Sequence, residues 1–313
     1  MPWSCPTLVV ERPEGSGVFV RLNDSYLRSI AYIGVARPGS DTQIDATGTG
    51  FLVVHDGATY LVTAAHVAVA YQDAAMDVRL NRDDNTGGIQ PIDTAKWYWH
   101  PDSKVDIAVM PFRVEPWARV IYFNTKHLAG DFKVQTKDLG TGDIAYVVGM
   151  FQELHGEERN VPVVHTGHIG SMGLEVVQVG DWRDGAKKGN KIGIQGFLIS
   201  APTLPGSSGS PVFVRRTLEV EGVEEVDAKT GKRVPIRAWT HGSVWLLGVW
   251  SAAWNEKQLG KTFVLGMGVC IPGERLFETL NQPELKELRD KAKAKKDKES
   301  KLSLQAKAKP AKV

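Results

Sequence analysis

The hydrophobic pattern of the chain consists of short apolar and β-branched runs separated by glycine, asparagine and aspartate. Apolar runs separated by such turn-forming residues are typical of strands joined by turns. The runs that we expect to be strands are Ile30–Val35, Gly50–Val54, Tyr60–Thr63, Asp77–Leu80, Asp106–Met110, Ile144–Val148, Val161–His165, Leu174–Val179, Ile192–Ser200, Pro211–Val214, Val244–Ser251 and Phe263–Ile271. Roughly a dozen strands without a strand–helix alternation favour an all-β fold of two six-stranded antiparallel β-barrels over one sandwich.

Helical signals are confined to two places before the C-terminal region. Ala65–Tyr71 is long enough for one or two turns, and Gly273–Leu280 is expected to be a short C-terminal helix. We therefore divide the chain into an N-terminal extension (1–24), a first β-barrel plus connector (25–141), a second β-barrel (142–280) and a Lys/Ala-rich tail (281–313).

The charge of the chain is unevenly placed, although its net value is only +2. The tail holds 11 Lys and Arg against 5 Asp and Glu. A basic tail, helical or disordered, is able to contact nucleic acid or an acidic partner. The alternative is a solvated extension that binds nothing.

The start of the chain and its cysteines bear on its compartment. The first residues have neither a basic start nor an apolar run of signal-peptide length. Cys5 and Cys270 lie at opposite ends of the chain, so a disulfide framework is not expected. No stretch approaches the ~20 apolar residues of a transmembrane helix. We expect a cytoplasmic protein with no membrane segment.

Three short motifs supply the groups of a nucleophilic hydrolase. His66 lies in Thr63–Val67, Asp106 in Val105–Ala108, and Ser208 in Gly206–Gly209. A serine hydroxyl is a poor nucleophile until a base takes its proton, and histidine does this near neutral pH. A buried carboxylate fixes the tautomer of the imidazole and stabilises the imidazolium. Each motif alone also fits a structural role, and it is their conjunction in an all-β chain that indicates catalysis.

These motifs carry a family resemblance that covers residues 28–280. The segments Gly48–Val54, Tyr60–Val67, His100–Val109 and Pro205–Phe213 resemble the trypsin-like serine peptidases, in particular the bacterial trypsin/DegP-like branch, here without a PDZ domain. The order His, Asp, Ser is that of the double-barrel enzymes and differs from that of subtilisins and α/β-hydrolases. The resemblance implies a chymotrypsin-like fold and a serine endopeptidase acting on proteins or peptides through an acyl-enzyme, without a cofactor.

The resemblance also implies a role for each site residue. His66 would be the general base, Asp106 its orienting partner and Ser208 the nucleophile. The backbone N–H groups of Gly206 and Ser208 would form the oxyanion hole.

Substrate binding is implied at positions that flank the nucleophile. Pro202 and Thr203 would lie at the primary pocket, and Ser251 in the wall that pairs with substrate. No acidic residue stands at the pocket floor, which argues against a preference for Arg or Lys.

Two features of the sequence depart from the digestive members of the family. No activation segment is visible, and Ser207 stands where digestive members of the family have an acid. The oxyanion hole must therefore be preformed, or ordered by substrate or a partner.

The rival to an enzyme is a trypsin-fold binding or scaffolding protein that has lost turnover. His165 and His168 do not suggest a metal site, because a spacing of three places strand residues on opposite faces.

Overall fold

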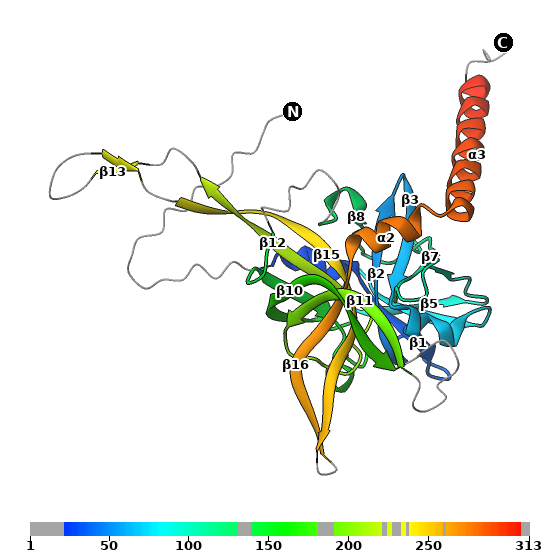
Figure 1. The fold of residues 1–313 in the computed structure, drawn as a ribbon. Helices are drawn as coiled ribbons and strands as arrows, with labels where there is room; N and C mark the ends of the chain where they lie inside the picture. The colour runs from blue at the N-terminus through cyan, green and yellow to red at the C-terminus, as the bar shows by residue number, and fades with distance from the viewer. Residues whose placement is uncertain are drawn as a thin grey trace.

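The structure, a computed structural model, describes residues 22–129, 139–180, 191–220, 224–226, 233–235, 238–258 and 261–307. Its N-terminal half is an eight-stranded sheet in which strands pair in the order β5-β4-β1-β2-β3-β7-β6, with β8 parallel to β2 (Figure 1). The strands are β1 (Ile30–Ala36), β2 (Ile44–His55), β3 (Ala58–Thr63), β4 (Met76–Asn81), β5 (Gly87–Ile92), β6 (Tyr98–Trp99), β7 (Ala108–Pro111) and β8 (Phe123–Asn124).

The C-terminal half is a closed antiparallel barrel of six strands in the order β10-β11-β16-β15-β12-β9. Its strands are β9 (Ile144–Gly149), β10 (Val163–Gly180), β11 (Lys191–Ser200), β12 (Pro211–Val220), β15 (Ala238–Gln258) and β16 (Lys261–Pro272). A separate two-stranded sheet, β13 (Glu224–Val226) with β14 (Arg233–Pro235), lies at the end of the extended β12–β15 arm (Figure 1). The predicted all-β, chymotrypsin-like fold is confirmed. The exact division of the chain at residues 141 and 142 stays a prediction.

In the part of the chain that the structure describes, helices are few and short until the C-terminus. They are η1 (Asp24–Ser29), α1 (Ala65–Ala68), η2 (Val69–Tyr71), η3 (Thr125–His127), η5 (Gln152–Leu154), α2 (Gly273–Leu280) and α3 (Pro283–Lys307). No helix in the described part of the chain combines the length and the apolar character needed to cross a bilayer.

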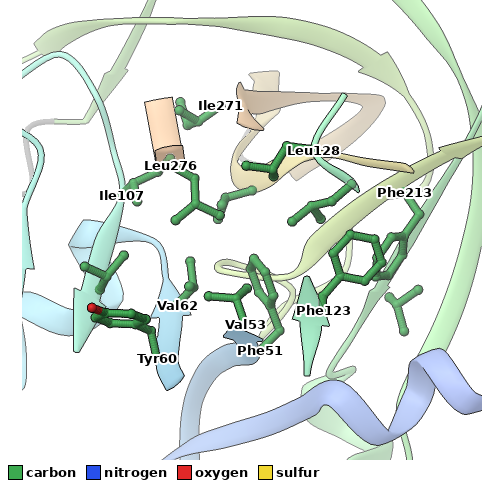
Figure 2. Close-up of a cluster of buried hydrophobic side chains, with 14 of the residues drawn as sticks. Phe51, Val53, Tyr60, Val62, Ile107, Phe123, Leu128, Phe213, Ile271 and Leu276 are labelled. Atoms are coloured by element: carbon green, nitrogen blue, oxygen red, sulfur yellow. The ribbon is translucent and has the colours of Figure 1, made fainter. Parts of the chain in front are cut away.

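The two halves are joined by one hydrophobic cluster, which we call the shared core (Figure 2). Its labelled members are Phe51, Val53, Tyr60, Val62, Ile107, Phe123, Leu128, Phe213, Ile271 and Leu276. Successive strand residues point to opposite faces of a sheet. Phe51 and Val53 of β2 therefore enter the shared core, while Leu52 enters a second cluster confined to the N-terminal half. Burial on both faces explains why these strands read as continuous apolar runs.

The first turns of α3 pack against the N-terminal sheet, which the charge of this segment did not indicate. Leu285 is fully buried in the shared core, and Arg289 is nearly so. The guanidinium of Arg289 donates to the hydroxyl of Tyr60 at 3.2 Å and to the carbonyl of Leu280 at 2.5 Å. Binding of nucleic acid by the tail stays a prediction.

This packing predicts that α3 stabilises the fold through Leu285. We expect Leu285→Ala to lower the free energy of unfolding by about 2–5 kcal/mol, because it leaves a cavity in the shared core. Leu288, one turn further along and 41% exposed, is the matched control, and its replacement by alanine should change stability by less than about 0.5 kcal/mol. Denaturant unfolding of the two variants measures both effects. Equal losses would show that α3 is not anchored by Leu285.

Candidate active site

His66 and Asp106 come together beside the end of β3 and the start of β7 in the N-terminal half. His66 lies in α1, directly after β3, and Asp106 immediately precedes Ile107 and β7. The strands β3 and β7 are paired, with Thr63 opposite Ala108, so their ends lie side by side. The ring Nδ1 of His66 is 2.7 Å from Oδ2 of Asp106.

The carboxylate of Asp106 is buried and fully engaged. Its Oδ1 accepts the backbone N–H of His66 at 2.9 Å. Its Oδ2 accepts both the His66 ring and the hydroxyl of Ser251, which is 2.5 Å away. An ionised carboxylate can only accept hydrogen bonds, so Nδ1 of His66 carries a proton and Nε2 is the basic nitrogen of the neutral ring.

The two charges shift each other's pKa values. Burial acts to lower the pKa of His66, but the charge and hydrogen bond of Asp106 outweigh burial and the net pKa is raised above the usual 6.5. Burial acts to raise the pKa of Asp106, but the attraction of His66 and the hydrogen bonds from His66 and Ser251 lower it. Asp106 is therefore ionised near neutral pH and favours the protonated form of the ring.

Ser208 reaches this pair from the loop between β11 and β12. Its hydroxyl donates to the backbone carbonyl of Ser251 at 3.3 Å, while the side chain of the same Ser251 holds Asp106. In the described residues the hydroxyl of Ser208 makes no hydrogen bond with His66. The structure thus gathers His66, Asp106 and Ser208 around Ser251, with the serine hydroxyl turned to a carbonyl rather than to the ring.

The loop that carries Ser208 is held close to β2 and β3. The amide of Thr49 donates to the carbonyl of Ser208 at 2.9 Å. A side chain at Gly209, where φ is +85°, would collide with the Thr49 carbonyl and the Thr63 hydroxyl. This close approach requires glycine after the serine.

Two backbone amides of the loop are free to bind a ligand. Within the ranges that the structure describes, the N–H groups of Gly206 and Ser208 donate no hydrogen bond, whereas those of Ser207, Gly209 and Ser210 each do. Gly206 has φ +88°, a conformation that favours glycine. These are the two amides that the family resemblance assigned to the oxyanion hole.

The predicted substrate-binding residues differ in burial and in their contacts. Ser251 is buried, and its hydroxyl contacts Asp106, a contact that the sequence did not indicate. Pro202 is exposed and Thr203 is half-buried in the segment that leads to Ser208. Their part in a primary pocket stays a prediction. His165 and His168 both lie on β10, and among the described residues no group of three potential metal ligands forms.

Sequence reasoning missed Thr49 and Gln152, which contact the Ser208 loop, and Arg79, which contacts the segment that follows Gln152. Thr49 lies between two glycines in a segment that we used only for its resemblance. Gln152 acts through its backbone amide, which every non-proline residue has. For Arg79 a signal was present, since it is a cation between Val78 and Leu80 in a predicted strand.

Comparison with known proteins agrees with the fold. The family model for the trypsin-like peptidase domain matches residues 48–223, more than half of the chain. The chain therefore belongs to the trypsin-like peptidase family, a family of proteases. No curated protein matches it.

Solved structures of the Rv3671c protease from M. tuberculosis are similar to this chain. The inactive form is 15% identical with a TM-score of 0.41, and the match covers 82% of this chain and 88% of that one. The active form is 15% identical with a TM-score of 0.42, covering 87% and 93%. The family assignment rests on the family model.

Proposed function

We propose that this chain is a serine endopeptidase that hydrolyses peptide bonds through an acyl-enzyme. Ser208 is the nucleophile, His66 the general base and Asp106 the residue that orients His66. The observation that carries the proposal is the buried carboxylate of Asp106, hydrogen-bonded to the His66 ring and to Ser251, whose carbonyl accepts the Ser208 hydroxyl.

Each step follows from these positions. The Ser208 oxygen attacks the substrate carbonyl carbon as its proton passes to Nε2 of His66. The free amides of Gly206 and Ser208 stabilise the oxyanion. His66 then gives the proton to the leaving amine, the C–N bond breaks, and the acyl group remains on Ser208. Water attacks the ester by the same route and restores the enzyme. The Ser208 hydroxyl must first turn from the Ser251 carbonyl to His66, and catalytic hydrogen bonds commonly tighten only when substrate binds.

The test is covalent labelling with a fluorophosphonate, followed by mass spectrometry of the modified peptide. This reagent needs an activated serine and does not depend on the unknown cleavage preference. We expect a single adduct on Ser208. A folded protein that takes up no label would favour the rival role, a trypsin-fold binding or scaffolding protein without turnover.

The pair of His66 and Asp106 also predicts the pH dependence of labelling. Only neutral His66 can accept a proton, and Asp106 raises the pKa of His66. The labelling rate should therefore fall on acidification, with a midpoint above the usual 6.5. In Asp106→Asn the charge is removed, so the midpoint of the residual rate should move to lower pH. A midpoint that stays in place would contradict the pairing.

A further inference from the structure

Arg79 on β4 is a fully buried cation that no acidic side chain contacts among the described residues. All five of its N–H groups are nonetheless used. They donate to Asn160 Oδ1 at 2.8 Å and to the backbone carbonyls of Thr42 at 3.2 Å, Glu157 at 3.0 Å, His155 at 2.9 Å and Gly156 at 2.9 Å. Burying a cation is costly unless it is hydrogen-bonded, so these carbonyls are tightly tied to its position.

Three of these four carbonyls belong to residues 155–157, within the segment 152–160 that follows β9 of the barrel. Arg79 therefore fastens a segment of the C-terminal half to a strand of the N-terminal half. Asn81 and Asn160 reinforce this tie: Asn81 Nδ2 donates to the Asn160 carbonyl at 2.9 Å, and the Asn160 amide donates to Asn81 Oδ1 at 2.8 Å. The Asn160 side chain also donates to the carbonyl of Arg79 at 2.7 Å.

The near end of the same segment holds the loop of Ser208. The amide of Gln152 donates to the carbonyl of Pro205 at 2.9 Å. Two residues earlier, the amide of Met150 donates to the Thr49 hydroxyl at 2.9 Å, and that hydroxyl donates to the carbonyl of Gly206 at 2.8 Å. The carbonyls on both sides of the Gly206 amide are thus held by the turn at 150–152 and by Thr49.

The hydrogen bond from Gln152 to the Pro205 carbonyl determines the direction of the Gly206 N–H. The carbonyl of Pro205 and the N–H of Gly206 belong to one planar peptide, and no described peptide is cis. In a trans peptide the oxygen and the hydrogen point in opposite directions. While Gln152 holds the oxygen, the N–H is turned to the other side, where it has no protein acceptor among the described residues.

We propose that Arg79 is a positioning residue for the oxyanion hole: it fixes residues 152–160, so that Gln152 keeps the Pro205–Gly206 peptide turned with its N–H toward the substrate carbonyl. This inference rests on the proposed function. It also accounts for the missing activation segment. With Arg79 as an internal buried cation, the oxyanion hole is preformed and needs neither a new N-terminus nor a partner.

Gln152→Pro tests the link nearest to the site. Proline cannot donate, so the variant loses the hydrogen bond to Pro205. It otherwise suits the position, because Gln152 begins η5 and Phe151 before it is extended. Gln152→Ala keeps the amide and is the matched control.

The readout is the rate at which a fluorophosphonate labels Ser208, measured together with the NMR titration of the His66 ring. We expect Gln152→Pro to slow labelling about 10²-fold, the loss typical of one oxyanion donor, with the His66 titration and the thermal midpoint unchanged. Gln152→Ala should label like the wild type. Equal rates in Gln152→Pro and Gln152→Ala would overturn the inference and leave the proposed function standing. No labelling of the wild type would overturn both.

Arg79→Met tests the far end of the chain of contacts. Its matched control is Leu80→Ala on the same strand, which removes packing from the N-terminal cluster without touching residues 152–160. At a temperature well below both unfolding midpoints, we expect Arg79→Met to slow labelling between about 10-fold and 10²-fold. It should also speed hydrogen exchange at the Gln152 amide. Leu80→Ala should do neither. Equal slowing in both variants, or wild-type exchange at Gln152 in Arg79→Met, would overturn the role of Arg79.

Discussion

Replacing Ser208 by alanine should abolish fluorophosphonate labelling and lower peptide hydrolysis by about 10⁴-fold to 10⁶-fold, leaving the fold intact. In the proposed mechanism the hydroxyl oxygen of Ser208 forms the acyl-enzyme, and we expect no other group of the site to replace it. It contributes little to packing, since the Ser208 side chain is only half-buried and its hydrogen bond to the Ser251 carbonyl is 3.3 Å long. Its loss should therefore move the thermal midpoint by no more than a few degrees.

The neighbouring serine is the matched control for this experiment. Ser207 is buried, and its hydroxyl donates to the carbonyl of Leu204 at 2.6 Å rather than to His66 or Asp106. Ser207→Ala should keep the label on Ser208. In the double variant Ser208→Ala with His66→Ala, the loss should match that of either single variant, because the residues act as one unit. Hydrolysis that survives Ser208→Ala but not Ser207→Ala would show that Ser207, and not Ser208, is the nucleophile.

Asp106→Asn should lower the rate about 10⁴-fold without unfolding the protein. The asparagine amide can donate to Nδ1 of His66, which moves the ring proton to Nε2 and leaves no base facing Ser208. The loss therefore comes from the wrong tautomer of a correctly placed ring. Measurement of kcat/KM, or of the labelling rate, together with the NMR signals of the His66 ring protons, checks both parts of this expectation.

Asp102 provides the control in the same loop. It is exposed, and its carboxylate accepts the backbone N–H of Lys104 rather than any atom of the site. Asp102→Asn should label at the wild-type rate. An equal loss in the two variants would mean that the loop's conformation, and not the carboxylate of Asp106, controls activity.

The strands that could be predicted are those with uninterrupted apolar runs. The runs in β1, β2 and β3 were visible because their residues are buried on both faces. β5 escaped notice because its sequence, Gly87–Ile92, contains two glycines and a proline. Its place at the edge of the sheet tolerates Pro91. β10 was expected as two strands, but bulges after Ile169 and Ser171 let one strand continue through the irregular stretch.

In the candidate site, residues that lie in short motifs could be predicted, whereas contacts between distant parts of the chain could not. His66, Asp106 and Ser208 could be predicted because each lies in a short motif whose residue types the chemistry requires. The supports of the site could not, since Thr49 and Gly206 are far apart in sequence and meet only in the folded chain. The link from Gln152 to Pro205 joins two backbones and leaves no mark on residue type.

The shared core has a consequence for the order in which this protease comes into being. Residues 51–62 are synthesised long before Phe213, Ile271 and Leu276, which cover them in the finished molecule (Figure 2). Until that second half emerges from the ribosome, the first half exposes apolar surface that the finished molecule buries. The nascent chain at that point has His66 and Asp106 but no Ser208, and it lacks the Ser251 that joins them. If Ser208 is the nucleophile, as we propose, a chain in this immature state cannot cut its neighbours, and proteolytic activity is expected only once the core has closed.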